Sequence, residues 1–144
     1  MWLIFAASAS ALWGLSYALS EQIYKYASIY TTLAVDTLII SVAFFIAAWY
    51  KGVLKSDITV ITTSPKVATL FVAGVIVFAF AELFIALSIT SKNATLAGLI
   101  EISYPLFIAL FAYLLFRESE LNSGTALGGL LIFFGVAIVY WFSK

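Results

Sequence analysis

Three carboxylates, Asp36, Glu82 and Glu101, lie inside otherwise apolar stretches of the sequence and are its strongest candidates for chemistry. A carboxylate at the centre of a membrane helix costs roughly 2.5–3.5 kcal/mol, and no Lys, Arg or His lies in the interior of these stretches. Because desolvation and neighbouring negative charge both favour the protonated form of a carboxyl, such a group can exchange a proton for a cation. Alternatively, each carboxyl is protonated and hydrogen-bonded between helices, with partners among Thr32, Ser88, Ser103 and Tyr104.

A proline follows one of these carboxylates at a distance of four residues. Pro105 has no N–H and therefore removes the helical hydrogen bond to the carbonyl oxygen of Glu101. We predict a helix kink at Pro105, and the freed carbonyl and the carboxylate would form one polar spot. A simple packing kink is the alternative.

Two aromatic residues near the N-terminus, Trp13 and Tyr17, are spaced four apart and share one helix face. They could stack on an aromatic or cationic substrate, or they could belong to ordinary packing or an interfacial belt. The candidates for binding a substrate or proton are therefore Glu101, Glu82, Asp36, Trp13, Tyr17 and Tyr104.

The elements that must position these residues are hydrophobic runs. Of the 144 residues, 65% are hydrophobic and 10% are charged, whereas soluble domains average roughly 45–50% apolar residues. Each run is close to or above the ~20 residues that a membrane-spanning helix needs. The sequence predicts an all-α membrane protein, with residues 1–144 as a single domain of five transmembrane helices. The runs cover about residues 2–20, 29–50, 66–91, 94–116 and 125–142.

The three carboxylates are predicted to share one depth in the membrane. Each lies seven to nine residues from a run end on the side away from the N-terminus, or about 10–14 Å below that face at 1.5 Å per residue. The second, third and fourth runs thus offer carboxyls in a single layer. Only the connection 51–65 is long enough to hold structure of its own, and Pro65 favours a helix start.

The last run contains glycines rather than charges. Gly124 and Gly128 form a GxxxG motif, and Gly135 follows seven residues later on nearly the same stripe. This pattern predicts a dimer interface, with contacts inside the monomer as the alternative.

Several function classes are disfavoured by composition. The chain has no Cys and no His, and its seven basic and seven acidic residues balance. We therefore expect no metal site, no cofactor and no nucleic-acid partner. Enzymatic activity is the least expected class, because nothing supplies a nucleophile with a matching base.

The loop charges give only a small orientation bias. Four basic residues fall on the side of the N-terminus and three on the other side, which weakly favours a cytoplasmic N-terminus. The small difference leaves open insertion in both orientations. The two groups are Lys51, Lys55, Lys66 and Arg117, against Lys25, Lys92 and Lys144.

The stretches "ALWGLSYALS", "ALSITSKNATLAGLIEISYPLFIALFAYLLFRES" and "LGGLLIFFGVAIVYW" resemble the EamA-type domain of the drug/metabolite transporter superfamily. The likeness is strongest where the family has a proline, an apolar run and a closing glutamate, here Pro105 and Glu118. Members usually contain two five-helix repeats of inverted topology and carry amino acids, nucleotide-sugars or other small metabolites. The resemblance therefore implies one half of a transporter, completed by a second copy.

The last helix is also similar to that of small multidrug resistance proteins, in which a glycine heptad mediates dimerisation; here the matching residues are Gly128 and Gly135. The essential glutamate of those proteins lies in their first helix, where this sequence has none. The resemblance therefore assigns no such role to Glu101 or Glu82.

Taken together, we expect a homodimeric secondary transporter, antiparallel or parallel, in the cell membrane, most simply a prokaryotic inner membrane. It would export a small organic metabolite or drug-like solute, with proton antiport through the carboxylates. Two alternatives remain: a flippase for a lipid-linked sugar, which would stack on Trp13 or Tyr17, and a non-transporting membrane subunit that packs against another protein.

Overall fold

A computed structural model describes residues 1–118 and 122–143. Over these residues the chain is helical and contains no strand, and five helical stretches are long and apolar enough to span a membrane. The expected fold class is thereby confirmed. Two charged residues counted above, Glu120 and Lys144, lie outside the described residues. The elements are α1 (Trp2–Ile23), α2 (Ile29–Tyr50), α3 (Leu54–Thr63), α4 (Pro65–Ser91), α5 (Ala94–Glu101), α6 (Tyr104–Phe111), the π-helix η1 (Ala112–Phe116) and α7 (Ser123–Phe142).

Large apolar side chains cover the outside of the helices. Phe44 and Trp141 are each 71% exposed, and most other Phe, Leu and Ile residues are similarly open. In water such a surface would drive aggregation, whereas lipid solvates it. The buried positions are mainly small residues, such as Ala86, Ala94 and Ala97, which let membrane helices approach closely.

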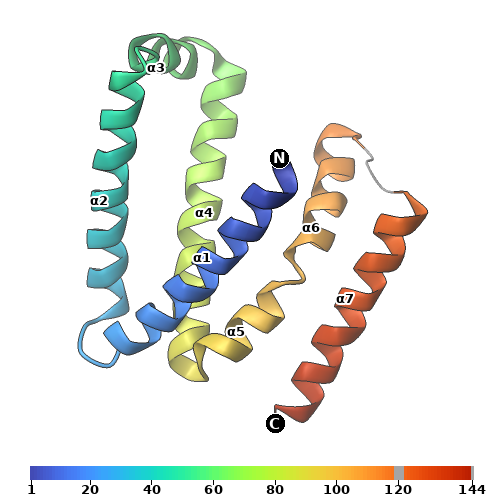
Figure 1. The fold of residues 1–144 in the computed structure, drawn as a ribbon. Helices are drawn as coiled ribbons and strands as arrows, with labels where there is room; N and C mark the ends of the chain where they lie inside the picture. Colours follow the sequence, from blue (N-terminus) through green and yellow to red (C-terminus); the bar gives the residue numbers. More distant parts are fainter. Residues whose placement is uncertain (119–121, 144) are drawn as a thin grey trace. The chain divides into compact units, whose positions relative to one another are not determined.

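The chain divides into two compact units. Unit 2 comprises Gln22–Leu87 and contains α2, α3 and most of α4. Ser28 caps α2 by accepting a hydrogen bond from the Tyr30 N–H. After α2 the backbone turns at Gly52, whose φ of 72° suits glycine. The short helix α3 then joins the end of α2 to the start of α4 (Figure 1).

Unit 1 combines the two ends of the sequence, Met1–Glu21 and Ser88–Lys144. Its described part contains α1, α5, α6, η1 and α7, and α5 packs against α7. Side chains of α1 reach α5, so residues more than 70 positions apart meet within this unit.

The run 94–116 forms one apolar span that is interrupted near its middle. Helix α5 ends at Glu101, the chain turns at Ile102 and Ser103, and α6 begins one residue before Pro105 (Figure 1). Proline is compatible with the first turn of a helix, because an N–H there has no helical acceptor to lose. The interruption precedes Pro105: Ile102 and Ser103 keep right-handed backbone angles between the two helices, and the kink at Pro105 itself stays a prediction.

The far end of this span is also irregular. Residues 112–116 form a π-helix, and Arg117 follows in the left-handed region with φ of 61°. The Arg117 guanidinium lies 5.7 Å from the centroid of the Tyr113 ring. This is a cation–π contact at the C-terminal end of η1.

Candidate carboxylate site

A hydrogen bond between α1 and α5 forms the centre of the candidate site. The hydroxyl of Tyr17 donates to Oε1 of Glu101 at 2.8 Å, although the two residues are 84 positions apart. Both side chains are half-buried. A donor aimed at a carboxylate oxygen gives a charge-assisted hydrogen bond, which is stronger than one between neutral groups. Two of the predicted site residues are thus brought together in unit 1.

A second aromatic ring extends the site along α1. The ring centroids of Trp13 and Tyr17 are 5.6 Å apart at an interplanar angle of 54°, and Trp13 is 48% exposed. On the other side, Tyr17 lies against Gly98 of α5: a Cβ added at Gly98 would stand 3.6 Å from Cδ2 of the Tyr17 ring. A methyl group would thus fit between the Tyr17 ring and the α5 backbone, whereas a larger side chain would displace the ring.

Glu21 provides a second connection between α1 and α5 that the sequence analysis missed. Its Oε2 accepts a hydrogen bond from the Ala94 N–H at 2.8 Å, while Oδ1 of Asn93 accepts from the Leu96 N–H at 2.8 Å. Both satisfy N–H groups in the first turn of α5, which have no helical acceptor. The sequence placed Glu21 in a connection, but α1 continues to Ile23.

A sequence signal for Glu21 existed. Trp13, Tyr17 and Glu21 are spaced at i, i+4 and i+8, so they form one stripe on α1. Glu21 lies one helical turn beyond Tyr17, so the spacing of Trp13 and Tyr17 also indicates that Glu21 shares their face.

The electrostatics of the site favour a positive charge. Glu101 is the last residue of α5, and the C-terminal end of a helix carries a partial negative charge. The carbonyl of Glu101 lacks its helical donor because residue 105 is proline. A carboxylate beside the C-terminal end of a broken membrane helix is an arrangement suited to a proton or another cation.

The remaining predicted residues belong to other elements. Tyr104, at the start of α6, is 56% exposed, and the hydrogen bond to Glu101 comes from Tyr17. Asp36 on α2 is exposed and Glu82 on α4 is half-buried, and both belong to unit 2. The common depth of the three carboxylates stays a prediction. Among residues 1–118 and 122–143, no three acidic residues converge as a metal site requires.

The glycines of α7 face two different surroundings. A Cβ at Gly129, a residue that the sequence did not single out, would stand 2.6 Å from Cδ2 of Leu106, so α7 packs closely against α6 there. A Cβ at Gly128 or Gly135 would have nothing within 4 Å, and one at Gly124 would stand 3.2 Å from Oδ1 of Asn122. The stripe through Gly128 and Gly135 is thus open, and its role as a dimer interface stays a prediction.

Comparison with known proteins gives one family. The model of the EamA-like transporter family matches residues 1–141, from α1 into the last turn of α7. No curated protein and no solved structure matches the chain.

Proposed function

Because this chain belongs to the EamA-like transporter family, we propose that it is a proton-coupled secondary transporter that exports a small organic metabolite or drug-like solute. Family membership and the five apolar spans make it a multi-pass membrane transporter of small solutes. Beyond family membership, the proposal specifies protons as the coupling ion and export as the direction. It also specifies Glu101, Tyr17 and Trp13 as the site, and a homodimer as the assembly. It also holds that the solute crosses without chemical conversion.

The observation that carries the proposal is the hydrogen bond from Tyr17 to Glu101 within the membrane-spanning region. When Glu101 is ionised, it accepts this hydrogen bond and attracts a cation; when it is protonated, that attraction is lost. A proton and a positively charged solute therefore compete for one carboxylate, which is the condition for antiport. Trp13, next to Tyr17, supplies an aromatic face for the solute.

The direction follows from the membrane in which such a protein would work. We place the chain in the inner membrane of a prokaryote, where the proton gradient is directed inward. A proton that enters and binds Glu101 displaces the solute to the outside, so exchange results in export.

Proton release on solute addition tests the coupling. Purified protein in weakly buffered detergent is mixed with amino acids, polyamines, quaternary amines or nucleotide-sugars, and a pH dye records released protons. We expect a signal with one class and its loss in Glu101→Gln. Asp57→Asn is the matched control, because Asp57 is an exposed carboxylate on α3.

Unchanged proton release in Glu101→Gln would refute the role of this carboxylate. Competition by a lipid-linked sugar instead of soluble solutes would favour a flippase. Absence of solute flux in proteoliposomes would favour a non-transporting subunit.

We further propose that a second copy of the chain supplies the other half of the transporter, through the open face of α7. Support comes from Gly128 and Gly135, where an added Cβ would meet no neighbouring atom, as expected of a surface that another helix approaches. The nearly balanced loop charges support an antiparallel pair with dual topology.

Chemical cross-linking in detergent tests the dimer. Gly128→Leu is expected to reduce the dimer fraction severalfold, because the larger side chain separates the two helices. Gly14→Leu on α1 is the control, since a Cβ there also meets nothing within 4 Å. An undiminished dimer in Gly128→Leu would contradict this interface, and a C-terminal reporter seen on one side only would contradict dual topology.

A further inference from the structure

The proposed transport mechanism assigns no role to helix α3. This helix is nevertheless the most amphipathic of the described helices. Leu54, Ile58 and Ile61 recur at i, i+4 and i+7 and form an apolar face, while Lys55 and Thr59 lie beside it. α3 connects two membrane spans, the 22-residue α2 and the 27-residue α4. A short amphipathic helix in that position lies at the level of the lipid headgroups.

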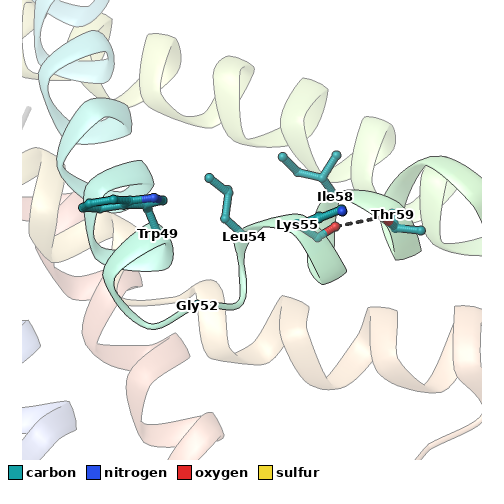
Figure 2. Close-up of a pocket in the computed structure, with 6 residues that line it drawn as sticks. All are labelled: Trp49, Gly52, Leu54, Lys55, Ile58 and Thr59. Carbon is teal, nitrogen blue, oxygen red and sulfur yellow. Dashed lines mark hydrogen bonds between the residues drawn. The ribbon is translucent and has the colours of Figure 1, made fainter.

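A hollow opens between the end of α2 and the first turns of α3 (Figure 2). It is open to the surroundings and has a volume of about 480 Å³. All its lining residues belong to unit 2. They are Trp49, Gly52, Leu54, Lys55, Ile58 and Thr59.

The walls of this α2–α3 hollow combine apolar side chains with one cationic side chain. Trp49, Leu54 and Ile58 provide apolar surface, and Trp49 is 72% exposed. Lys55 provides a cation, whereas the hydroxyl of Thr59 donates to the Lys55 carbonyl at 2.9 Å. A ligand of this hollow therefore needs an anionic group beside an apolar part.

The surrounding charge is also positive. Residues 49–66 contain three lysines, Lys51, Lys55 and Lys66, and a single acidic residue, Asp57. Tryptophan at the end of a membrane span marks the membrane–water interface. Anionic phosphates attract basic side chains at this depth.

We propose that the α2–α3 hollow binds an anionic phospholipid of the surrounding membrane. Lys55 contacts the headgroup phosphate, Lys51 adds positive charge beside the lining residue Gly52, and the start of an acyl chain lies along Trp49, Leu54 and Ile58. Charge complementarity selects the anionic headgroup, and the apolar wall continues into the lipid-facing surface of α2. This binding is independent of which solute the protein carries.

Lipid retention measured by native mass spectrometry tests the proposal. The purified full chain is mixed with phosphatidylglycerol or phosphatidylcholine that carry identical acyl chains. We expect tighter binding of phosphatidylglycerol, and a loss of about fivefold for each lysine removed, as in Lys55→Gln and Lys51→Gln. Phosphatidylcholine also carries a phosphate, but its choline cation repels the lysines, so its retention is expected to fall less in these variants than that of phosphatidylglycerol.

Lys25→Gln is the matched control, because Lys25 is an exposed lysine of unit 2 outside the hollow, hydrogen-bonded to Gln22. Trp49→Ala should lower the retention of both lipids. Equal retention of the two lipids by the unaltered protein would overturn the proposal. An equal loss in Lys25→Gln, or displacement of the lipid by inorganic phosphate, would overturn it as well.

Discussion

Removal of the Tyr17 hydroxyl is the sharpest perturbation of the α1–α5 pair. Tyr17→Phe leaves the carboxylate of Glu101 without the donor now 2.8 Å away. Hydrogen bonds to charged groups contribute about 1.5–3 kcal/mol in soluble proteins, whereas couplings in membrane proteins average about 0.6 and reach about 1.7 kcal/mol. The pair is half-buried, so we expect a coupling of about 1 kcal/mol.

A double-mutant cycle measures this coupling. Tyr17→Phe, Glu101→Leu and the double variant are unfolded in mixed detergent micelles, and their free energies of unfolding are compared. Each single change removes one partner of this hydrogen bond, whereas the double change removes both. The double variant should therefore lose less stability than the sum of the singles.

A second cycle with Tyr104→Phe serves as the control, since Tyr104 is close to Glu101 in sequence but is not the donor in this hydrogen bond. We expect Tyr104→Phe and Glu101→Leu to be additive within about 0.3–0.5 kcal/mol. Additivity in the Tyr17 cycle, or a larger coupling in the Tyr104 cycle, would refute the assignment of Tyr17 as the partner of Glu101.

Two further predictions concern helix contacts in unit 1. Glu21→Ala removes the acceptor of the Ala94 N–H and should lower the free energy of unfolding by about 1 kcal/mol, as for other lost helix caps; an unchanged unfolding curve would contradict it. Gly129→Ala places a Cβ 2.6 Å from Cδ2 at the flexible end of the Leu106 side chain, so that side chain must rotate, while alanine favours the helix by about 0.8–1.0 kcal/mol. The two effects oppose each other, so we expect Gly129→Ala to be more stabilising when Leu106→Ala is also present, and full additivity of the two changes would contradict the contact.

The five spans were predictable because insertion into a bilayer depends mainly on how many apolar residues a segment contains. Each run carries enough apolar residues to cross the bilayer, whatever its neighbours are. The start of α4 at Pro65 was indicated in the same way, since proline at the beginning of a helix loses no hydrogen bond. These features depend on local sequence alone.

The contacts within the site were harder to predict from the sequence. The spacing of Trp13 and Tyr17 indicated a shared face, but the partner of Tyr17 lies 84 residues away and no local pattern indicates it. Glu21 was assigned to a connection because its acceptor role depends on α5. Pro105 indicated an irregularity, but the sequence did not indicate that the helix would be interrupted at Ile102 and Ser103.

The residue at position 98, here glycine, can change the position of the Tyr17 ring without any change to a charged residue. The Tyr17 ring lies where a Cβ at position 98 would make ordinary contact at 3.6 Å, so alanine fits there while any larger side chain would move the ring. A displaced ring carries its hydroxyl away from Glu101 and changes the space beside Trp13. In the proposed mechanism, the size of the uncharged side chain at position 98 would thus change the space offered to the solute without any change to the carboxylate.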